Sequence, residues 1–198
     1  MRIIDVEQGS QEWLNCRKGK VTASHATAIA TDGKGLDTYI LELMSDYYSS
    51  GERVYYSNPD MDRGNELEEL AAAMYEMENG VTLEKVGFVE FNDYVGCSPD
   101  RLVGKNGLVE IKCPNDKNYF KLLLDGKVST DYIAQMQMQM LITGREWCDF
   151  VAYNPNFEKS LFVKRFTPDQ QKFDQLEVGF QSAEEKIKHI KKQLTTIK

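Results

Sequence analysis

Residues 97–114 read CSPDRLVGKNGLVEIKCP and form the most informative part of the chain. The segments 101–103 and 107–112 are short apolar runs, with the turn-forming Lys105-Asn106-Gly107 between them. An Asn-Gly pair between two apolar runs is a strong signal for a β-hairpin. We therefore expect two adjacent strands here, preceded by a turn at Ser98-Pro99-Asp100.

The polar side chains of this hairpin are expected to lie close together. In a strand, residues two apart point to the same face, so Glu110 and Lys112 share one face while Ile111 points to the opposite layer. The hairpin returns Glu110 toward the strand end that bears Asp100, and two carboxylates then converge beside one ammonium group. The main-chain carbonyl of Ile111 is close enough to be a further oxygen ligand.

This group of side chains suits a hard divalent cation. Mg²⁺ takes oxygen ligands and is typically held by one or two carboxylates together with substrate phosphate. A bound cation lowers the pKa of a coordinated water and polarises a phosphoryl oxygen, and Lys112 can orient that water or stabilise the growing charge. The pattern indicates metal-assisted phosphodiester hydrolysis. The alternative is a solvated hairpin with ordinary surface charges.

Periodicity divides the rest of the chain into helices and strands. Helices are expected at 10–18 with Ser10 as the cap, 22–30, 36–49, 62–79, 117–125, 131–143 and 168–195 with Thr167 as the cap. Further strands are expected at 81–91, 94–98, 147–153 and 161–166, and a loop at 50–61. Helices before and after a central group of strands indicate an α/β or α+β sandwich, which we interpret as one domain over residues 1–198.

The composition is that of a globular chain, with 198 residues, 41% hydrophobic and 28% charged. No apolar run approaches the roughly 18 residues that a membrane-spanning helix needs, and the N-terminus has no signal-peptide pattern, so a soluble intracellular protein is expected. The cysteines form no CxxC pair, which disfavours a zinc ribbon or an iron–sulfur cluster. They are expected to be reduced thiols in or near the core: Cys16, Cys97, Cys113 and Cys148.

The net charge of −7 argues at first against a nucleic-acid partner, but the charge is unevenly distributed. Residues 52–100 hold 12 acids and 3 bases, whereas residues 101–145 hold 7 bases and 4 acids, and residues 164–198 hold 8 bases and 5 acids. Screening over about 8 Å at physiological salt makes local charge more important than the total. An acidic chain can therefore contact phosphate through a basic strip, or through a metal bound by its own carboxylates.

Short motifs follow one another in a fixed order along residues 5–153. They are Val6-Glu7-Gln8-Gly9, Glu12-Trp13, Arg17-x-Gly19, Val21-Thr22-Ala23-Ser24, Gly64-x-x-x-Glu68, Cys97-Ser98-Pro99-Asp100, Glu110-Ile111-Lys112-Cys113-Pro114 and Tyr132-x-Ala134-Gln135-x-Gln137. In this order they resemble the lambda-type alkaline exonucleases of phage recombination systems, the YqaJ-like viral recombinases, within the PD-(D/E)XK nuclease superfamily. The resemblance implies a central mixed β-sheet flanked by helices, with extra N-terminal helices and a long C-terminal helix.

The resemblance also implies roles for single residues. Asp100 and Glu110 would be metal ligands with the Ile111 carbonyl, Lys112 the catalytic lysine, Glu68 a helix carboxylate beside the metals and Gln135 the active-site glutamine. For two of these residues the alternative to a role at the metal site is an ordinary structural role. Glu68 can be a solvent-facing helix residue, and Gln135 can lie with Gln139, four residues on, on the polar face of an amphipathic helix.

Arg17 and Ser24 match the residues that bind the terminal 5′-phosphate in this family. Arg17 supplies a planar fork for phosphate oxygens, and Ser24 lies near the start of the expected helix 22–30, where free N–H groups favour an anion. The alternative is a surface arginine and a helix cap.

The family has a basic residue shortly after its Lys-Cys-Pro motif. Here Asn115-Asp116-Lys117 breaks the alignment, and Lys117 is the candidate.

By resemblance the protein is expected to be a 5′→3′ exonuclease that uses Mg²⁺, with two ions and with Mn²⁺ as a substitute. It would degrade one strand of double-stranded DNA from 5′-phosphorylated ends and leave a 3′ single-stranded tail. The resemblance further implies a ring-shaped homotrimer, a single-strand annealing protein as partner, no membrane, and a phage- or prophage-encoded origin in the bacterial cytoplasm.

Two rival functions remain at this stage. One is an endonuclease or junction resolvase of the same superfamily, which has no need for a terminal-phosphate pocket. The other is an inactive DNA-binding module, which the presence of Asp100, Glu110 and Lys112 disfavours.

Two further groups of residues have open roles. Tyrosines that flank Arg53 can stack on bases or pack in the core and loops: Tyr47, Tyr48, Tyr55 and Tyr56. Lysines of the C-terminal helix form either a solvated face or a DNA contact: Lys186, Lys188, Lys191 and Lys192.

Overall fold

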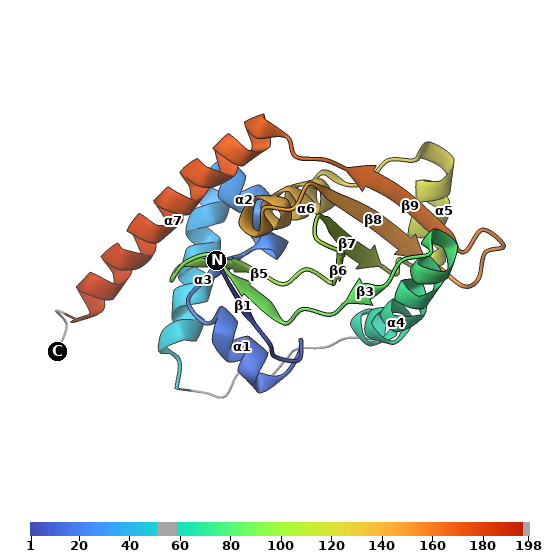
Figure 1. The fold of residues 1–198 in the computed structure, drawn as a ribbon. Coiled ribbons are helices and arrows are strands. Elements are labelled where there is room, and N and C mark those ends of the chain that lie inside the picture. The colour runs from blue at the N-terminus through green and yellow to red at the C-terminus, as the bar shows by residue number, and fades with distance from the viewer. Residues whose placement is uncertain (51–58, 196–198) are drawn as a thin grey trace.

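The computed structural model describes residues 1–50 and 59–195, which form two mixed β-sheets with helices around them (Figure 1). The larger sheet has the order β3-β6-β7-β8-β9, and the smaller has the order β1-β4-β5-β2. The strands of the larger sheet are β3 (Leu83–Glu84), β6 (Arg101–Val103), β7 (Gly107–Lys112), β8 (Trp147–Tyr153) and β9 (Leu161–Phe166). Those of the smaller are β1 (Arg2–Ile4), β2 (Val21–Thr22), β4 (Phe88–Glu90) and β5 (Val95–Cys97). Only the pairs β7–β8 and β2–β5 are parallel among these described strands.

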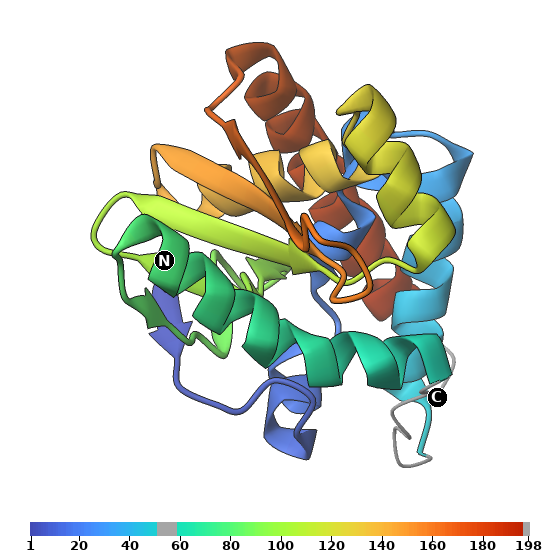
Figure 2. The same ribbon diagram turned by 90° about the vertical axis from the view of Figure 1, so that its right-hand side faces the viewer.

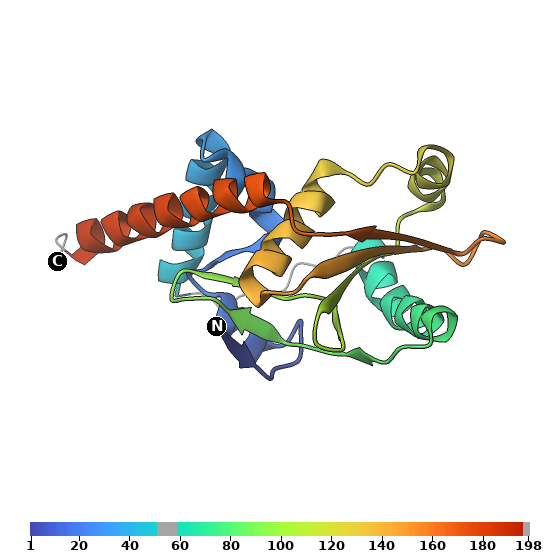
Figure 3. The same ribbon diagram turned by 45° about the horizontal axis from the view of Figure 1, so that its top comes forward.

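The helices are grouped around these sheets. They are α1 (Gln11–Arg17), the 3₁₀ turn η1 (Ala23–His25), α2 (Ala26–Thr31), α3 (Lys34–Tyr48), α4 (Pro59–Asn79), α5 (Asp116–Asp125), α6 (Thr130–Thr143) and α7 (Gln170–Thr195). The long α7 packs across α2 and α3 and extends away from the sheets (Figure 3). Within the described ranges, no helix is long and apolar enough to cross a bilayer.

Two apolar clusters hold the larger sheet between helices. Met136 of α6 belongs to one cluster with Leu108 of β7, and Tyr75 of α4 belongs to the other with Ile111 of the same strand. Side chains alternate along a strand, so α6 and α4 cover opposite faces of β7. Figure 2 shows α4 along the near side of this sheet. The predicted α/β architecture, with helices on both faces of a mixed sheet, is confirmed.

The sequence predictions hold best in the middle of the chain. Strands 101–103, 107–112, 147–153 and 161–166 have the predicted bounds, and Ser10 caps α1 by accepting a hydrogen bond from Trp13 N. The hairpin turn differs in detail, since Gly104 takes the left-handed φ of 50°. Gly107 is instead the first residue of β7, where a side chain would overlap the ring of Trp147.

Three element predictions were wrong. The strand expected at 81–91 is two strands in different sheets, because the chain crosses at Gly87, where a side chain would overlap the backbone of Val6. The helix expected at 22–30 begins only at Ala26, after a short strand and the 3₁₀ turn. The cap of α7 is Asp169 rather than Thr167, since Asp169 Oδ1 accepts from Lys172 N.

Two further differences concern a short strand that was not predicted and the start of a helix. The strand β1 was not predicted; its three residues carry no recognisable period. Helix α4 begins at Pro59, inside the loop expected at 50–61, and proline is tolerated at a first helical position because its missing N–H needs no partner there. The part of this expected loop at 51–58 lies outside the described residues.

Gly179 allows α7 to lie close to α2. A side chain there would overlap the backbone of Ile29, so Gly179→Ala is expected to lower the free energy of unfolding by about 1–3 kcal/mol through overpacking. Gly35→Ala is the matched control, since its added methyl would meet Ala28 Cβ at 3.6 Å, an ordinary contact. Denaturant unfolding measures both, and equal stability of Gly179→Ala and wild type would contradict this account.

Candidate active site

Asp100, Glu110 and Lys112 lie together at the β6–β7 hairpin. Asp100 directly precedes β6, and its Oδ2 accepts a hydrogen bond from the main-chain N–H of Ile111, 2.7 Å away. Lys112 Nζ lies 2.5 Å from Glu110 Oε1. Glu110 is fully buried, whereas the Lys112 side chain is 27% exposed. The two carboxylates and the ammonium therefore converge, as the alternation along β7 predicts.

Electrostatics in this cluster favour a bound cation. The low polarity around Asp100 raises its pKa well above the ordinary range, and the nearby charge of Glu110 raises it further. At Lys112, burial lowers the pKa, but the carboxylates of Glu110 and Asp100 outweigh burial, and the net shift is upward. Lys112 thus stays protonated, while the two carboxylates repel each other unless a positive charge lies between them.

Two glutamines of α6 donate to the buried carboxylate. Gln135 Nε2 lies 2.6 Å from Glu110 Oε1, and Gln139 Nε2 lies 2.7 Å from Glu110 Oε2. The polar face of α6 is thus turned toward the sheet and not to solvent, and Gln139 is fully buried. Gln137, between them, points elsewhere, and its Nε2 donates to Thr167 O at 2.8 Å. The sequence signal for Gln139 was its spacing of four from Gln135.

Glu68 of α4 is held near this cluster by a buried arginine. Arg101 Nη1 donates to Glu68 Oε1 at 2.7 Å and to the main-chain oxygen of Asp100 at 2.6 Å, and its Nη2 donates to Glu69 Oε1 at 2.8 Å. Glu68 and Asp100 line one groove of about 690 Å³, together with Trp13. Arg101 was not singled out from the sequence, where a single arginine after a turn carries no signal.

Oxygen atoms suited to a metal are the carboxylates of Asp100 and Glu110 and the main-chain carbonyl of Ile111. Within residues 1–50 and 59–195, no three His, Cys, Asp or Glu side chains are arranged to hold an ion by themselves. A set of two carboxylates completed by carbonyl and water oxygens fits Mg²⁺, which keeps several waters, better than it fits a zinc centre.

A second polar cluster surrounds Arg17. Its Nη2 donates to Thr22 Oγ1 at 3.2 Å, and Thr22 Oγ1 lies 3.3 Å from Ser24 Oγ. A cavity of about 200 Å³ is lined here by Arg17, Lys20, Thr22, His25 and Tyr39, and also by the acidic Glu42 and Asp46. Ser24 lies in the 3₁₀ turn, ahead of α2. The helix expected at 22–30 therefore begins two residues after Ser24, and the basic side chains of Arg17 and Lys20 both line the cavity.

Trp13 connects the two clusters. The guanidinium of Arg17 lies over the Trp13 ring, 4.2 Å from its centroid, and Trp13 Nε1 donates to Ser98 Oγ at 2.8 Å. Ser98 belongs to the turn that ends in Asp100. Arg17 is thus linked through the side chains of Trp13 and Ser98 to the turn that ends in Asp100, a carboxylate of the first cluster.

The remaining candidates lie on the surface. Lys117 is exposed in the first turn of α5. Tyr47 is half-buried, and Lys191 Nζ lies 4.6 Å from its ring centroid, whereas Tyr48 is exposed. Tyr55 and Tyr56 lie outside the described residues. Lys186 pairs with Asp32 and Asp37, Lys188 pairs with Glu184, and Lys192 lies near the C-terminal end of α7.

The four cysteines are free thiols, as predicted. Cys97 and Cys148 are buried, and Cys16 and Cys113 are half-buried. Burial raises the pKa of Cys113 to about 11, so this thiol next to Lys112 is protonated at neutral pH.

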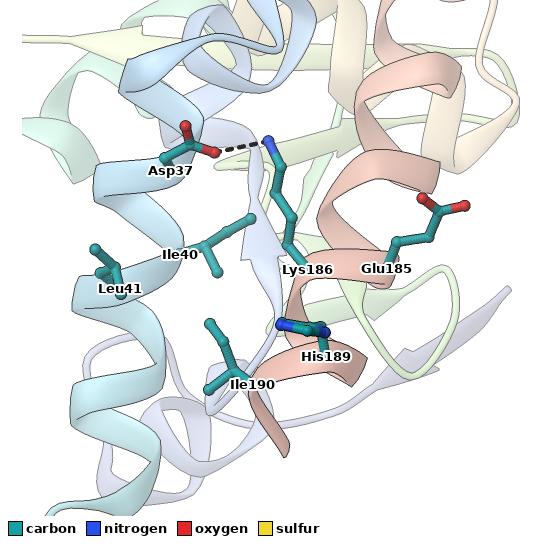
Figure 4. Close-up of a pocket in the computed structure, with 7 residues that line it drawn as sticks. All are labelled: Asp37, Ile40, Leu41, Glu185, Lys186, His189 and Ile190. Carbon is teal, nitrogen blue, oxygen red and sulfur yellow. Dashed lines mark ion pairs between the residues drawn. The ribbon is translucent and has the colours of Figure 1, made fainter. Parts of the chain in front are cut away.

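A separate groove of about 510 Å³ lies between α3 and α7 (Figure 4). Ile40, Leu41 and Ile190 give it an apolar wall, and Lys186 pairs with Asp37 at 2.7 Å on its edge. None of its lining residues belongs to the two polar clusters, so this groove is not part of the candidate site.

The fold is that of the PD-(D/E)XK nucleases, and the chain is a nuclease of this class. It belongs to the YqaJ-like viral recombinase domain family, whose model matches residues 12–146. No curated protein matches the chain significantly.

Solved structures give the same assignment. The crystal structure of LHK-Exo, an alkaline exonuclease from Laribacter hongkongensis, is 34% identical, with a TM-score of 0.83 over 96% of this chain and 100% of that one. The complex of LHK-Exo with dAMP has a TM-score of 0.84 at the same identity and coverage. A phage-related exonuclease from Haemophilus somnus 129PT is 18% identical, with a TM-score of 0.63 over 91% and 98% of the chains, and shares the fold.

Neutralising Asp100 should stabilise the metal-free protein. Because the pKa of Asp100 is raised in the folded state, the folded protein binds more protons than the unfolded chain, and stability falls as pH rises above the ordinary carboxyl range. Asp100→Asn removes this cost and keeps an acceptor for Ile111 N. We expect a gain of about 0.5–2 kcal/mol in the free energy of unfolding at pH 8 with EDTA.

Asp116→Asn is the matched control for this measurement. Hydrogen bonds from Asn154, and then from Asn156, lower the pKa of Asp116, so its charge is favoured in the folded state. The control variant should therefore lose stability at pH 8, and its difference from wild type should vanish at low pH. A melting temperature of Asp100→Asn below that of wild type at pH 8 would contradict the account.

Proposed function

We propose that this protein is a Mg²⁺-dependent 5′→3′ exonuclease that digests one strand of double-stranded DNA from 5′-phosphorylated ends. The observation that supports it most is the convergence of Asp100 and Glu110 beside Lys112, with Lys112 Nζ 2.5 Å from Glu110 Oε1. A further support is the relative with dAMP, a DNA mononucleotide. The 3′ single-stranded tail left by such digestion is the substrate for recombination by strand annealing.

The metal would be held by Asp100, Glu110 and the carbonyl of Ile111. When bound, two Mg²⁺ ions, or Mn²⁺ in their place, would supply an activated water and stabilise the leaving 3′ oxygen. The other parts of the catalytic site are side chains of the protein. Lys112 keeps a positive charge beside the scissile phosphate, Gln135 holds Glu110 Oε1, and Glu68 extends the acidic lining of the groove.

Arg17 and Ser24 would bind the 5′-phosphate of the DNA end. Their side chains are linked through Thr22, and Arg17 is stacked on Trp13, which fixes the guanidinium plane. Binding one end in this cluster places the next phosphodiester at a set distance from Asp100. This is the feature that distinguishes an exonuclease from an endonuclease or resolvase, which cuts without a terminal phosphate.

The wider assembly follows from the family resemblance. We propose a single nuclease domain over residues 1–198 that forms a homotrimeric ring on DNA and works with a single-strand annealing protein in the bacterial cytoplasm. Lys117, exposed on α5, would contact the DNA backbone. A mass of one chain from light scattering, at assay concentration, would remove the ring from this proposal.

A digestion time course on linear and covalently closed circular duplex, with Mg²⁺, tests the activity. We expect the linear form to lose one strand and the circle to survive. Lys112→Met should lower the rate by about 10²–10³-fold, because it removes a charge aimed at the developing oxyanion. Lys121→Met, which changes an exposed lysine of α5, is the matched control. Cutting of the circle, or full activity of Lys112→Met, would contradict the proposal.

The terminal-phosphate pocket has its own test. Duplexes with a 5′-phosphate should be digested faster than duplexes with a 5′-hydroxyl, and Arg17→Ala should reduce this preference by about 10–100-fold, the value of a charge-assisted hydrogen bond. Arg2→Ala is the control, since Arg2 is exposed and pairs with Glu90. Equal rates on both ends in the wild type would remove Arg17 and Ser24 from the site.

A further inference from the structure

The two oxygens of Glu110 have different surroundings. Oε1 accepts from Lys112 Nζ at 2.5 Å and from Gln135 Nε2 at 2.6 Å, and both of these residues are half-buried. Oε2 accepts from Gln139 Nε2 at 2.7 Å, and Gln139 is fully buried. Oε1 is therefore the oxygen on the accessible side of the carboxylate, and Oε2 is the oxygen in the core.

The other end of the Gln139 amide has no partner. Its Oε1 is the one buried side-chain nitrogen or oxygen without a hydrogen bond in the part of the chain that the structure describes. An unpaired buried oxygen destabilises a fold. A methionine would fill the same space without this cost but would leave the buried Glu110 Oε2 without its donor, so the contribution of Gln139 lies in its bond to Glu110.

Gln137 shows what a structural glutamine looks like on the same helix. It is also buried, but both ends of its amide are used: Nε2 donates to Thr167 O at 2.8 Å, and Oε1 accepts from Asp169 N at 2.9 Å. These bonds fasten α6 to the segment that leads into α7. Among the described residues, the Gln139 side-chain amide makes a single hydrogen bond, and its partner is Glu110. This indicates that the role of Gln139 is to hold the Glu110 carboxylate.

We propose that Gln139 is a positioning residue for the metal site. By holding Oε2 in the core, it fixes the rotation of the Glu110 carboxylate and turns Oε1 toward the side of Lys112 and Gln135, where a divalent cation would bind. Gln139 acts through Glu110 and does not touch the substrate. The inference rests on the proposed metal-dependent function and adds a residue that its motifs do not include.

Mn²⁺ binding to the DNA-free protein, measured by calorimetry, tests this role. Gln139→Met should raise the Kd for Mn²⁺ by about 10–100-fold, the usual effect of losing a partner behind a metal ligand. Its melting temperature with EDTA should fall below that of wild type, because the buried Glu110 Oε2 loses its donor, so the Kd for Mn²⁺ is compared with that of a control that is also destabilised. Gln137→Met, the matched control, should melt at a lower temperature and bind Mn²⁺ as wild type does.

Other results separate the two proposals. If Gln139→Met binds Mn²⁺ like wild type, or if Gln137→Met weakens binding equally, the positioning role is overturned while the nuclease proposal stands. A wild type that binds no Mn²⁺ and digests no DNA overturns both. Should Gln139→Met fail to fold, Gln139→Asn takes its place, because it keeps the amide but is one methylene too short to reach Glu110, and it should show the same loss of Mn²⁺ affinity.

Discussion

The fully buried carboxylate of Glu110 constrains the rest of the structure. A charge of this kind costs several kcal/mol to remove from water unless it is paired and hydrogen-bonded. The chain meets this demand with Lys112 two residues along β7 and with Gln135 and Gln139 from α6. Helix α6 must therefore cross β7 with its glutamine face inward, and β7 must lie inside the sheet between β6 and β8.

The second carboxylate depends on segments far away in the sequence. Asp100 ends a turn whose Ser98 accepts from Trp13 Nε1 and whose Pro99 carbonyl accepts from Gln8 Nε2 at 2.9 Å. Gln8 also donates to Val86 O at 2.8 Å, next to the crossing at Gly87. The N-terminal residues thus hold the turn against the sheet, which gives the short motifs before residue 20 a physical reason to accompany the hairpin.

The sequence predicted those parts of the molecule whose signals are local. The alternation in 107–112 placed Glu110 and Lys112 on one face, and the apolar runs at 147–153 and 161–166 gave strands with correct bounds. The family resemblance brought in Glu68 and Gln135, which periodicity alone would assign to polar helix faces.

What the sequence could not predict depends on contacts between distant segments. Arg101 is buried because two glutamates of α4 approach it, and nothing near residue 101 signals that approach. Gln139 was assigned to a polar face without the information that this face meets Glu110. The strands β1 and β2 are too short to show a period, and Gly87 divides a continuous β-type pattern only because Val6 lies against it.

The most direct test of the central claim is anomalous diffraction from crystals of the protein soaked with Mn²⁺. The account predicts a strong anomalous peak within coordination distance of the carboxylates of Asp100 and Glu110 and the main-chain oxygen of Ile111, with Lys112 beside it. A saturating soak that leaves these oxygens without a peak, or places Mn²⁺ on other residues alone, would contradict it.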